Sequence, residues 1–193
     1  MGWEIMATGI RIAFKSNVHL GRIQTFAWDR NWNITGATRE GESPTRFSWE
    51  TIDGRTEIIY LEDPYIGINY VLIKGDSVLP VADDIRPTLD CWSFDEAISL
   101  ATGSTDRDAK IRGIYVSALS ASRSERDRLV QVFRQLAGDA DPDIRHALLV
   151  GIGYVGPDSR LREIAESLRD NDPDDNVRRD AGLLIEGLGS QGQ

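Results

Sequence analysis

The chain is poor in cysteine and has no long apolar run, and both shortages restrict what it can be. A single cysteine, Cys91, occurs in 193 residues, so neither an internal disulfide nor a zinc site with two thiolates can form. No stretch approaches the roughly 20 apolar residues that a membrane helix needs. The first residues, MGWEIM, also lack the basic and then apolar pattern of a signal peptide. These absences predict a cytoplasmic protein that does not bind a membrane.

Basic charge is scarce as well, which argues against nucleic acid as a partner. The net charge of -9 divides into -4 before Ser93 (9 basic, 13 acidic residues) and -5 from there on (13 basic, 18 acidic). Binding to phosphate backbones depends mainly on Lys and Arg, so an acidic chain favours a basic partner instead. The two histidines, His19 and His146, lie in no catalytic motif. We therefore expect no catalytic residue, no cofactor and no metal.

The first region, residues 1–89, has the pattern of an antiparallel β-meander. Strands are predicted over Thr45–Ile52, Thr56–Glu62 and Gly67–Lys74, with a short fourth strand at Ser77–Val81. Asp53-Gly54 between the first two favours a type I′ hairpin turn. Three further expectations concern the flanks: an edge strand at Gly9–Lys15, a helix or a strand at Val18–Trp28, and a loop at Asn31–Ser43. Residues Asp83–Leu89 are predicted to be a linker.

The second region, residues 90–193, opens with a helix-start signal and then repeats itself. Ser93 and Glu96 match a capping box, in which each side chain satisfies an orphan amide of the first helical turn. The pattern Asp-x-x-(Ile/Val)-Arg then recurs every 33 residues, ending at Arg112, Arg145 and Arg178. Self-similarity at this interval is typical of stacked helical hairpins.

Amphipathic segments precede the second and third copies. Apolar residues three and four apart place each set on one helix face; the two sets are Leu129, Val132, Phe133 and Leu136, and Leu161, Ile164, Ala165 and Leu168. One hairpin cannot bury such a stripe, so neighbouring hairpins must stack. The predicted fold class is α+β: an antiparallel meander followed by a short α-solenoid of about three hairpins.

The repeats resemble HEAT repeats, in particular the short HEAT-like class found in phycobilisome lyases. The resemblance covers Ser93 to Gly189 and rests on DPDIRHALLVGIGYVG and DPDDNVRRDAGLLIEGLG. In that family, aspartate and arginine of the second helix commonly form a ladder between repeats. The resemblance therefore implies structural roles for Asp108, Asp141, Asp174, Arg112, Arg145 and Arg178. The first copy departs from the family pattern at Gly113 and Tyr115, and residues before Ser93 resemble no family known to us.

Gly151, Gly153 and Gly156 form a GxGxxG pattern, which in a nucleotide-binding fold joins a strand to a helix. The 33-residue register instead places Arg145–Tyr154 on a helix, and too little chain follows for further βα units. A second match, Gly187, Gly189 and Gly192, falls at the corresponding place in the last copy. We expect these glycines to end helices.

Aspartates cluster where the turns within the hairpins should lie. Asp141 before Pro142 and Asp172 before Pro173 suit an N-cap followed by proline. Capping does not account for Asp139, Asp170 and Asp175. These three could instead recognise a basic partner or form part of a calcium-like site. In the first region, Trp28 and Trp32 are candidate exposed anchors, since tryptophan is enriched at binding hot spots.

The expected function is that of a non-catalytic protein-binding module. The best guess is a bacterial immunity protein, an antitoxin that neutralises a toxin through an acidic surface suited to fast association with a basic enzyme. The alternative is a HEAT-like lyase that handles a chromophore, or another scaffold associated with an enzyme. The sequence does not decide the partner or the oligomeric state.

Overall fold

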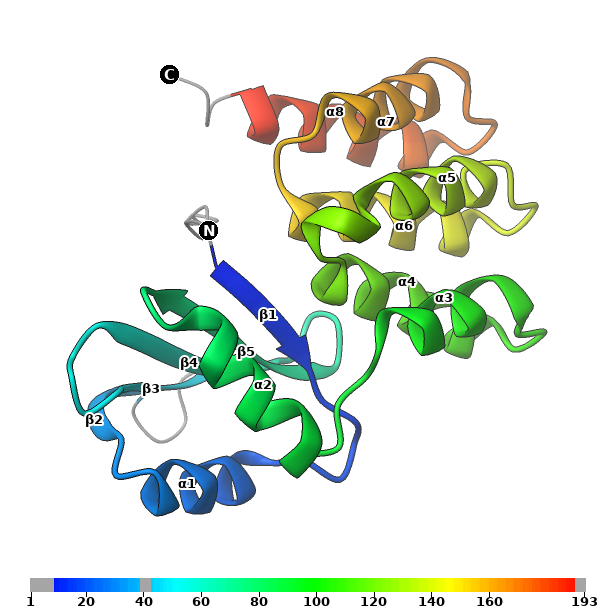
Figure 1. Ribbon diagram of the computed structural model, residues 1–193. Coiled ribbons are helices and arrows are strands. Elements are labelled where there is room, and N and C mark those ends of the chain that lie inside the picture. Colours follow the sequence, from blue (N-terminus) through cyan, green and yellow to red (C-terminus); the bar gives the residue numbers. More distant parts are fainter. Residues whose placement is uncertain (1–8, 39–42, 190–193) are drawn as a thin grey trace. The chain divides into compact units, whose positions relative to one another are not determined.

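The computed structural model describes residues 9–38 and 43–189, which form two compact units (Figure 1). We call Gly9–Trp92 the sheet unit and Ser93–Gly189 the repeat unit. The division falls close to the predicted boundary after residue 89. A five-stranded antiparallel sheet and the helices that follow it confirm the predicted α+β class. Within the described ranges, no helix combines the length and apolar character needed to span a bilayer.

The sheet unit contains five strands and two helices. In chain order these are β1 (Gly9–Ala13), α1 (Leu20–Asp29), β2 (Asn33–Ala37), β3 (Thr45–Glu50), β4 (Thr56–Asp63), β5 (Ile68–Gly75) and α2 (Val78–Thr88). The strand order is β1-β5-β4-β3-β2, and all neighbours are antiparallel. The meander β2 to β5 is thus closed at one edge by β1, as predicted for Gly9–Lys15.

Both helices of this unit cover the same face of the sheet. Alternate residues of the strands, such as Trp49, Ile58 and Tyr60, point to that face and are almost completely buried. They pack against apolar stripes of α1 and α2, which include Phe26 and Ile85. The core of the sheet unit therefore lies between one sheet face and two helices.

Five predictions for this unit are corrected or resolved by the structure. Ser77–Val81 and Asp83–Leu89, predicted as a strand and a linker, instead form parts of helix α2, with Ser77 and Leu89 as its caps. Residues 33–37, predicted as loop, form the edge strand β2, while 39–42 of that predicted loop lie outside the described residues. The segment at 18–28 is helical. Asp53-Gly54 does not form a type I′ turn, because positive φ occurs there at Gly54 alone.

The repeat unit consists of three stacked helical hairpins (Figure 1). Their helices are α3 (Phe94–Gly103) and α4 (Arg107–Ser120), then α5 (Arg126–Leu136) and α6 (Pro142–Val155), then α7 (Ser159–Asn171) and α8 (Asp175–Gly189). A short 3-10 turn, η1 (Arg123–Glu125), precedes α5. The helices α4, α6 and α8 are neighbours in the stack, and so are α3, α5 and α7. This arrangement is the one that the 33-residue period predicts.

Local signals position the ends of these helices. The Ser93 side chain accepts from the Glu96 amide, and the Glu96 carboxylate accepts from the Ser93 amide, so the predicted capping box is present. Helix α6 runs through Gly151 and Gly153 to Val155, and Gly156, whose φ is 83°, is its C-cap. The helix predicted from the register is confirmed, but only Gly156 ends it, so the expectation that all three glycines end helices is wrong. Of the second match, Gly187 and Gly189 lie on α8, and Gly192 is outside the described residues.

The first hairpin differs from the other two in how closely its helices approach. A Cβ atom on Gly113 would lie 2.4 Å from the backbone nitrogen of Ala101, so this position of α4 requires glycine. The equivalent residues 33 and 66 positions later are His146 and Arg179, which have exposed or half-exposed side chains. Helix α4 also begins two residues earlier in the register, because Asp106 rather than Asp108 caps it.

Candidate functional site

The aspartates of the hairpin turns do two different kinds of work. Asp106, Asp141 and Asp174 cap α4, α6 and α8, since their carboxylates accept hydrogen bonds from amides of the first helical turn. This confirms the capping predicted for Asp141. Asp172 was also predicted to be an N-cap, and here the structure differs. It lies just beyond the end of α7, and its carboxylate is buried.

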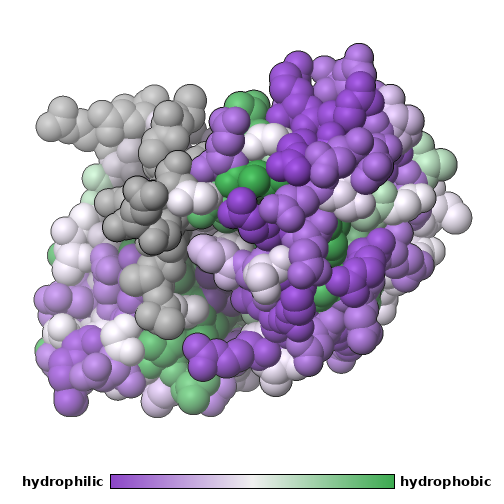
Figure 2. All heavy atoms as spheres, turned by 90° about the horizontal axis from the view of Figure 1, so that it is seen from above, coloured by the Kyte–Doolittle hydropathy of each residue, from purple (hydrophilic) through white to green (hydrophobic). Residues whose placement is uncertain are grey.

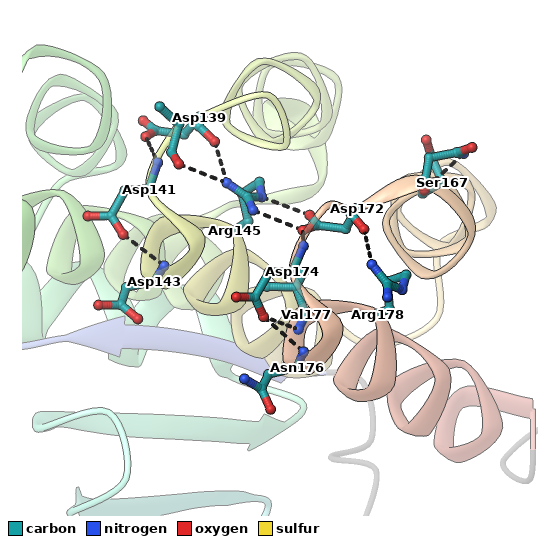
Figure 3. A network of polar contacts seen from close by, with 12 residues as sticks. Asp139, Asp141, Asp143, Arg145, Ser167, Asp172, Asp174, Asn176, Val177 and Arg178 are labelled. Atoms are coloured by element: carbon teal, nitrogen blue, oxygen red, sulfur yellow. Dashed lines mark hydrogen bonds and ion pairs between the residues drawn. The ribbon is translucent and has the colours of Figure 1, made fainter.

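Asp172 is the acceptor of a buried ion pair of the repeat unit (Figure 3). Arg145 on α6 donates from Nε to Asp172 Oδ2 at 2.7 Å and from Nη2 to Oδ1 at 2.9 Å. The Arg145 side chain is 6% exposed and that of Asp172 is 1% exposed. This bidentate geometry suits a guanidinium and a carboxylate and links the second hairpin to the third.

The third guanidinium nitrogen of Arg145, Nη1, binds the turn of its own hairpin. Nη1 donates to the carbonyl oxygens of Asp139 at 2.7 Å and Ala140 at 3.1 Å. The buried guanidinium is therefore hydrogen-bonded at all three nitrogens, which offsets the loss of its hydration. Its hydrogen bonds to Asp172 lower the pKa of that carboxyl below its ordinary value, although burial acts in the opposite direction.

An equivalent contact joins the first and second hairpins. Lys110 Nζ on α4 donates to Asp139 Oδ2 at 2.9 Å, and Asp139 precedes Asp172 by one repeat interval. The Asp139 side chain is 18% exposed, and its other oxygen accepts from the Asp141 amide at 3.0 Å. That amide, and secondarily Lys110, lowers the pKa of Asp139. Asp139 is therefore not the spare surface charge predicted from the sequence, because one carboxylate oxygen binds Lys110 of the first hairpin and the other accepts from an amide of its own turn.

The cation of this ladder differs between the first copy and the second. Arg145 has the implied structural role, whereas Arg112, at the same register position, is exposed and takes no part in the ladder contacts. Arg178 repeats one contact of Arg145, donating from Nη1 to the carbonyl of Asp172 at 2.5 Å, and pairs with Asp175 on its own helix. Asp108 is 84% exposed and contacts Arg107, so it is not a ladder residue.

A second set of ion pairs joins the first helices of successive hairpins, and it was not predicted from the sequence. Arg128 on α5 binds Asp95 on α3, and Arg160 on α7 binds Asp127 on α5 at 2.5 Å. In each pair the partners are 33 residues apart, so the repeat interval itself was the signal that could have identified them. All four side chains are substantially exposed, so these pairs contribute little stability.

Other aspartates remain on the surface at the same edge of the stack. We call Asp108, Asp143, Asp170 and Asp175 the acidic edge; they lie in or beside the three hairpin turns, and their side chains are 84%, 58%, 56% and 87% exposed. Each of them pairs with an arginine: Asp108 and Asp143 with Arg107, Asp170 with Arg169, and Asp175 with Arg178. Exposed pairs of this kind exchange partners at little free-energy cost. Of the predicted contact residues, Asp170 and Asp175 are therefore accessible.

The two predicted aromatic anchors of the sheet unit have different surroundings. Trp28, in the last turn of α1, is 82% exposed. Asn31, with φ of 53°, then reverses the chain, and the Trp32 amide donates to the Ala27 carbonyl in a Schellman motif. This places the Trp32 ring at 5.5 Å and 70° from Phe26, so Trp32 belongs to the core and not to an exposed site. The tryptophans and the acidic edge belong to different units and are treated as separate surfaces.

The described residues also show what the other candidate groups do. His146 Nε2 lies 3.1 Å from Asp180 Oδ2 and links α6 to α8. Burial raises the pKa of the Cys91 thiol to about 11, so it stays protonated at neutral pH. An open hollow of about 340 Å³ in the sheet unit is lined by Glu50, Glu57 and Lys74, which are neighbours across β3, β4 and β5. No histidine, cysteine or serine lines it.

The visible surface is mainly polar. Figure 2 shows one face of the molecule, on which hydrophilic side chains form the larger part of the surface and hydrophobic ones are confined to smaller patches.

Within the described ranges no group of three acidic, histidine or cysteine side chains is arranged to hold a metal ion. Comparisons with protein-family models, with curated proteins and with solved structures found no match to this chain.

Proposed function

We propose that the repeat unit is a non-catalytic scaffold that binds a basic protein along the acidic edge, as a bacterial immunity protein binds and neutralises a toxin in the cytoplasm. The observation that supports this most directly is the repetition of exposed carboxylates, with at least one beside each of three successive turns. Stacked hairpins keep such groups at regular spacing. A partner with a row of arginines or lysines would meet a matching row of aspartates.

Electrostatics supports the same proposal. The chain carries a net charge of -9, which attracts a basic partner at long range and raises the rate of association. The buried ladder fixes the turns, while the acidic-edge carboxylates are held by exposed arginines that a partner's cations can replace. The ladder therefore provides rigidity, and the acidic edge provides the contact.

The first experiment is to recover the tagged protein from its native host and identify what it binds. A basic protein whose binding weakens with salt is the expected result. Recovery of pigment or of DNA-associated material without a bound protein would overturn the proposal in favour of a chromophore-handling or nucleic-acid role.

The second experiment tests the surface with that partner. Asp170→Arg combined with Asp175→Arg should slow association by about tenfold or more and leave thermal unfolding almost unchanged. Asp127→Arg combined with Glu163→Arg is the matched control, because these two acidic residues are exposed on α5 and α7, lie outside the acidic edge and, like it, pair with arginines. Equal slowing by both double variants would mean that net charge matters and the acidic edge does not.

A further inference from the structure

One helix of the repeat unit carries glycines that its own packing does not require. Glycine in a helix interior is less stable than alanine by about 0.5–1 kcal/mol, so a buried contact usually explains it. At Gly113 and Gly151 such contacts exist, since an added Cβ would lie 2.4 Å from Ala101 and 3.2 Å from Phe133, respectively. A Cβ on Gly182 of α8 would meet no atom within 4 Å. The helix therefore has an open notch at this position.

A large apolar side chain lies directly beside this notch. Leu183 is 60% exposed, which is unusual for a leucine on an amphipathic helix whose buried face is formed by Val177, Ala181 and Ile185. Arg179 and Glu186 complete the same surface, because residues at i, i+3, i+4 and i+7 share one helix face. We call Arg179, Gly182, Leu183 and Glu186 the α8 stripe. All four are exposed or half-exposed.

The α8 stripe is complementary to itself. In two antiparallel helices related by a two-fold axis between positions 182 and 183, residues at equal steps from the axis face each other. Leu183 then enters the notch at the partner copy's Gly182, and Arg179 faces the partner copy's Glu186. Each contact occurs twice, as an isologous interface requires.

We propose that α8 is a homodimerisation surface, on which a second copy of this chain packs antiparallel through the α8 stripe. The commitment to a second copy rests on the symmetry of the stripe, which carries a protrusion and a notch, and a cation and an anion, in mirrored order about one point. A helix of another protein would need only a notch for Leu183 and charges opposite to Arg179 and Glu186, and it would not need α8 to carry both members of each complementary pair. The surface uses no residue of the acidic edge, so this proposal stands or falls independently of the proposed function.

The expected dimer is weak. One helix from each copy buries an area at or below the lower limit of about 1,200 Å² for stable specific interfaces. The dimer should therefore form in a concentration-dependent manner, and the exposed charges should make it sensitive to salt.

Sedimentation velocity over a range of concentrations, with the full chain, tests the proposal. Leu183→Asp and Gly182→Leu should each weaken dimerisation by about tenfold or more, the first by removing the apolar contact and the second by filling the notch. Gly182→Leu also favours the helix, so loss of the dimer cannot be attributed to unfolding. Gly103→Leu is the control, because a Cβ there also meets nothing within 4 Å but the residue lies at the end of α3.

Charge exchange tests the antiparallel register. Arg179→Glu alone and Glu186→Arg alone should each weaken self-association, and a mixture of the two variants should form a heterodimer, because both ion pairs are then restored. A wild-type protein that stays monomeric at the highest soluble concentration overturns the proposal. So does a dimer that survives Gly182→Leu, or a mixture that fails to associate.

Discussion

The two units are stabilised by contacts of different range along the chain, and this difference determines which binding surfaces each unit can present. The sheet unit joins distant parts of the chain, as in the pairing of Ile12 on β1 with Val71 on β5. The repeat unit joins neighbours at a nearly constant interval, as in the contact between Arg145 and Asp172. A core built from contacts between distant parts of the chain unfolds cooperatively as one unit. In a stack of repeats, the stability of each repeat depends on its interfaces with its neighbours. Only the stack presents the same kind of surface three times.

The largest predicted effect compares one ion pair from each unit. Asp172→Ala should destabilise the protein by about 3–5 kcal/mol, because it leaves the Arg145 guanidinium buried without its partner. Asp84→Ala removes a bidentate partner of Arg30 in the sheet unit, but that pair is partly exposed, so the loss should be below about 1 kcal/mol. Denaturant unfolding of both variants measures the difference. Similar losses would show that burial does not separate the two pairs.

The second comparison concerns how far a core defect spreads. Ile58 and Ile152 are both fully buried, and replacement of either by alanine should destabilise by about 2–5 kcal/mol. Hydrogen exchange should distinguish the two variants. Ile58→Ala should lower the protection of all five strands together, whereas Ile152→Ala should lower that of α5 to α8 more than that of α3. Uniform loss across the repeat unit would show that the stack unfolds as a single cooperative body.

The same contrast explains which elements could be predicted from the sequence. Strand β3 alternates between apolar and polar residues, whereas β4 and β5 are marked by continuous apolar runs that are buried on both faces. The hairpins were predictable because each copy repeats the same pattern of buried residues. Strand β2 has the sequence NITGA, lies at an edge and is mostly exposed, so no apolar pattern marks it. Helix α2 was misread although Val78, Val81, Ala82 and Ile85 have helical spacing, because Pro87 suggested a linker and the segment before it was assigned to the meander. Pro87 lies in the last turn, and the helix ends one residue later at Thr88.

The candidate site was predictable in its class and not in its details. That aspartates and arginines of the repeats form a ladder was implied by the resemblance to HEAT repeats, but the sequence did not show which cation binds each carboxylate. In the first hairpin Gly113 packs closely against Ala101 of α3, and Lys110, not Arg112, binds Asp139. The exposure of Trp28 and the burial of Trp32 likewise depend on the left-handed Asn31, which no hydrophobic pattern reveals.

Acid should weaken the repeat unit through Asp172. Its pKa is lowered in the folded protein, so the carboxylate contributes stability above its unfolded pKa and loses that contribution as the pH falls through the folded pKa. Wild-type stability should therefore decline on acidification, starting near the ordinary aspartate pKa of about 4. Asp172→Asn, although less stable at neutral pH, should show a shallower decline, because the titrating group is gone. Parallel pH profiles for the two proteins would assign the acid sensitivity to other carboxylates.

The smallest predicted effect lies at the start of the repeat unit. Ser93→Ala breaks the capping box of α3 and should cost about 1 kcal/mol, because the Glu96 amide in the first turn loses its acceptor. Ser99→Ala is the matched control, since Ser99 is an exposed residue within the same helix, where alanine is favoured. Hydrogen exchange should show the first turn of α3 opening more often in Ser93→Ala, with the strands unchanged, because an end hairpin of a stack can fray by itself. If the strands lost protection to the same extent, the two units would unfold together, and the contrast between a closed core and a modular stack would not hold for this chain.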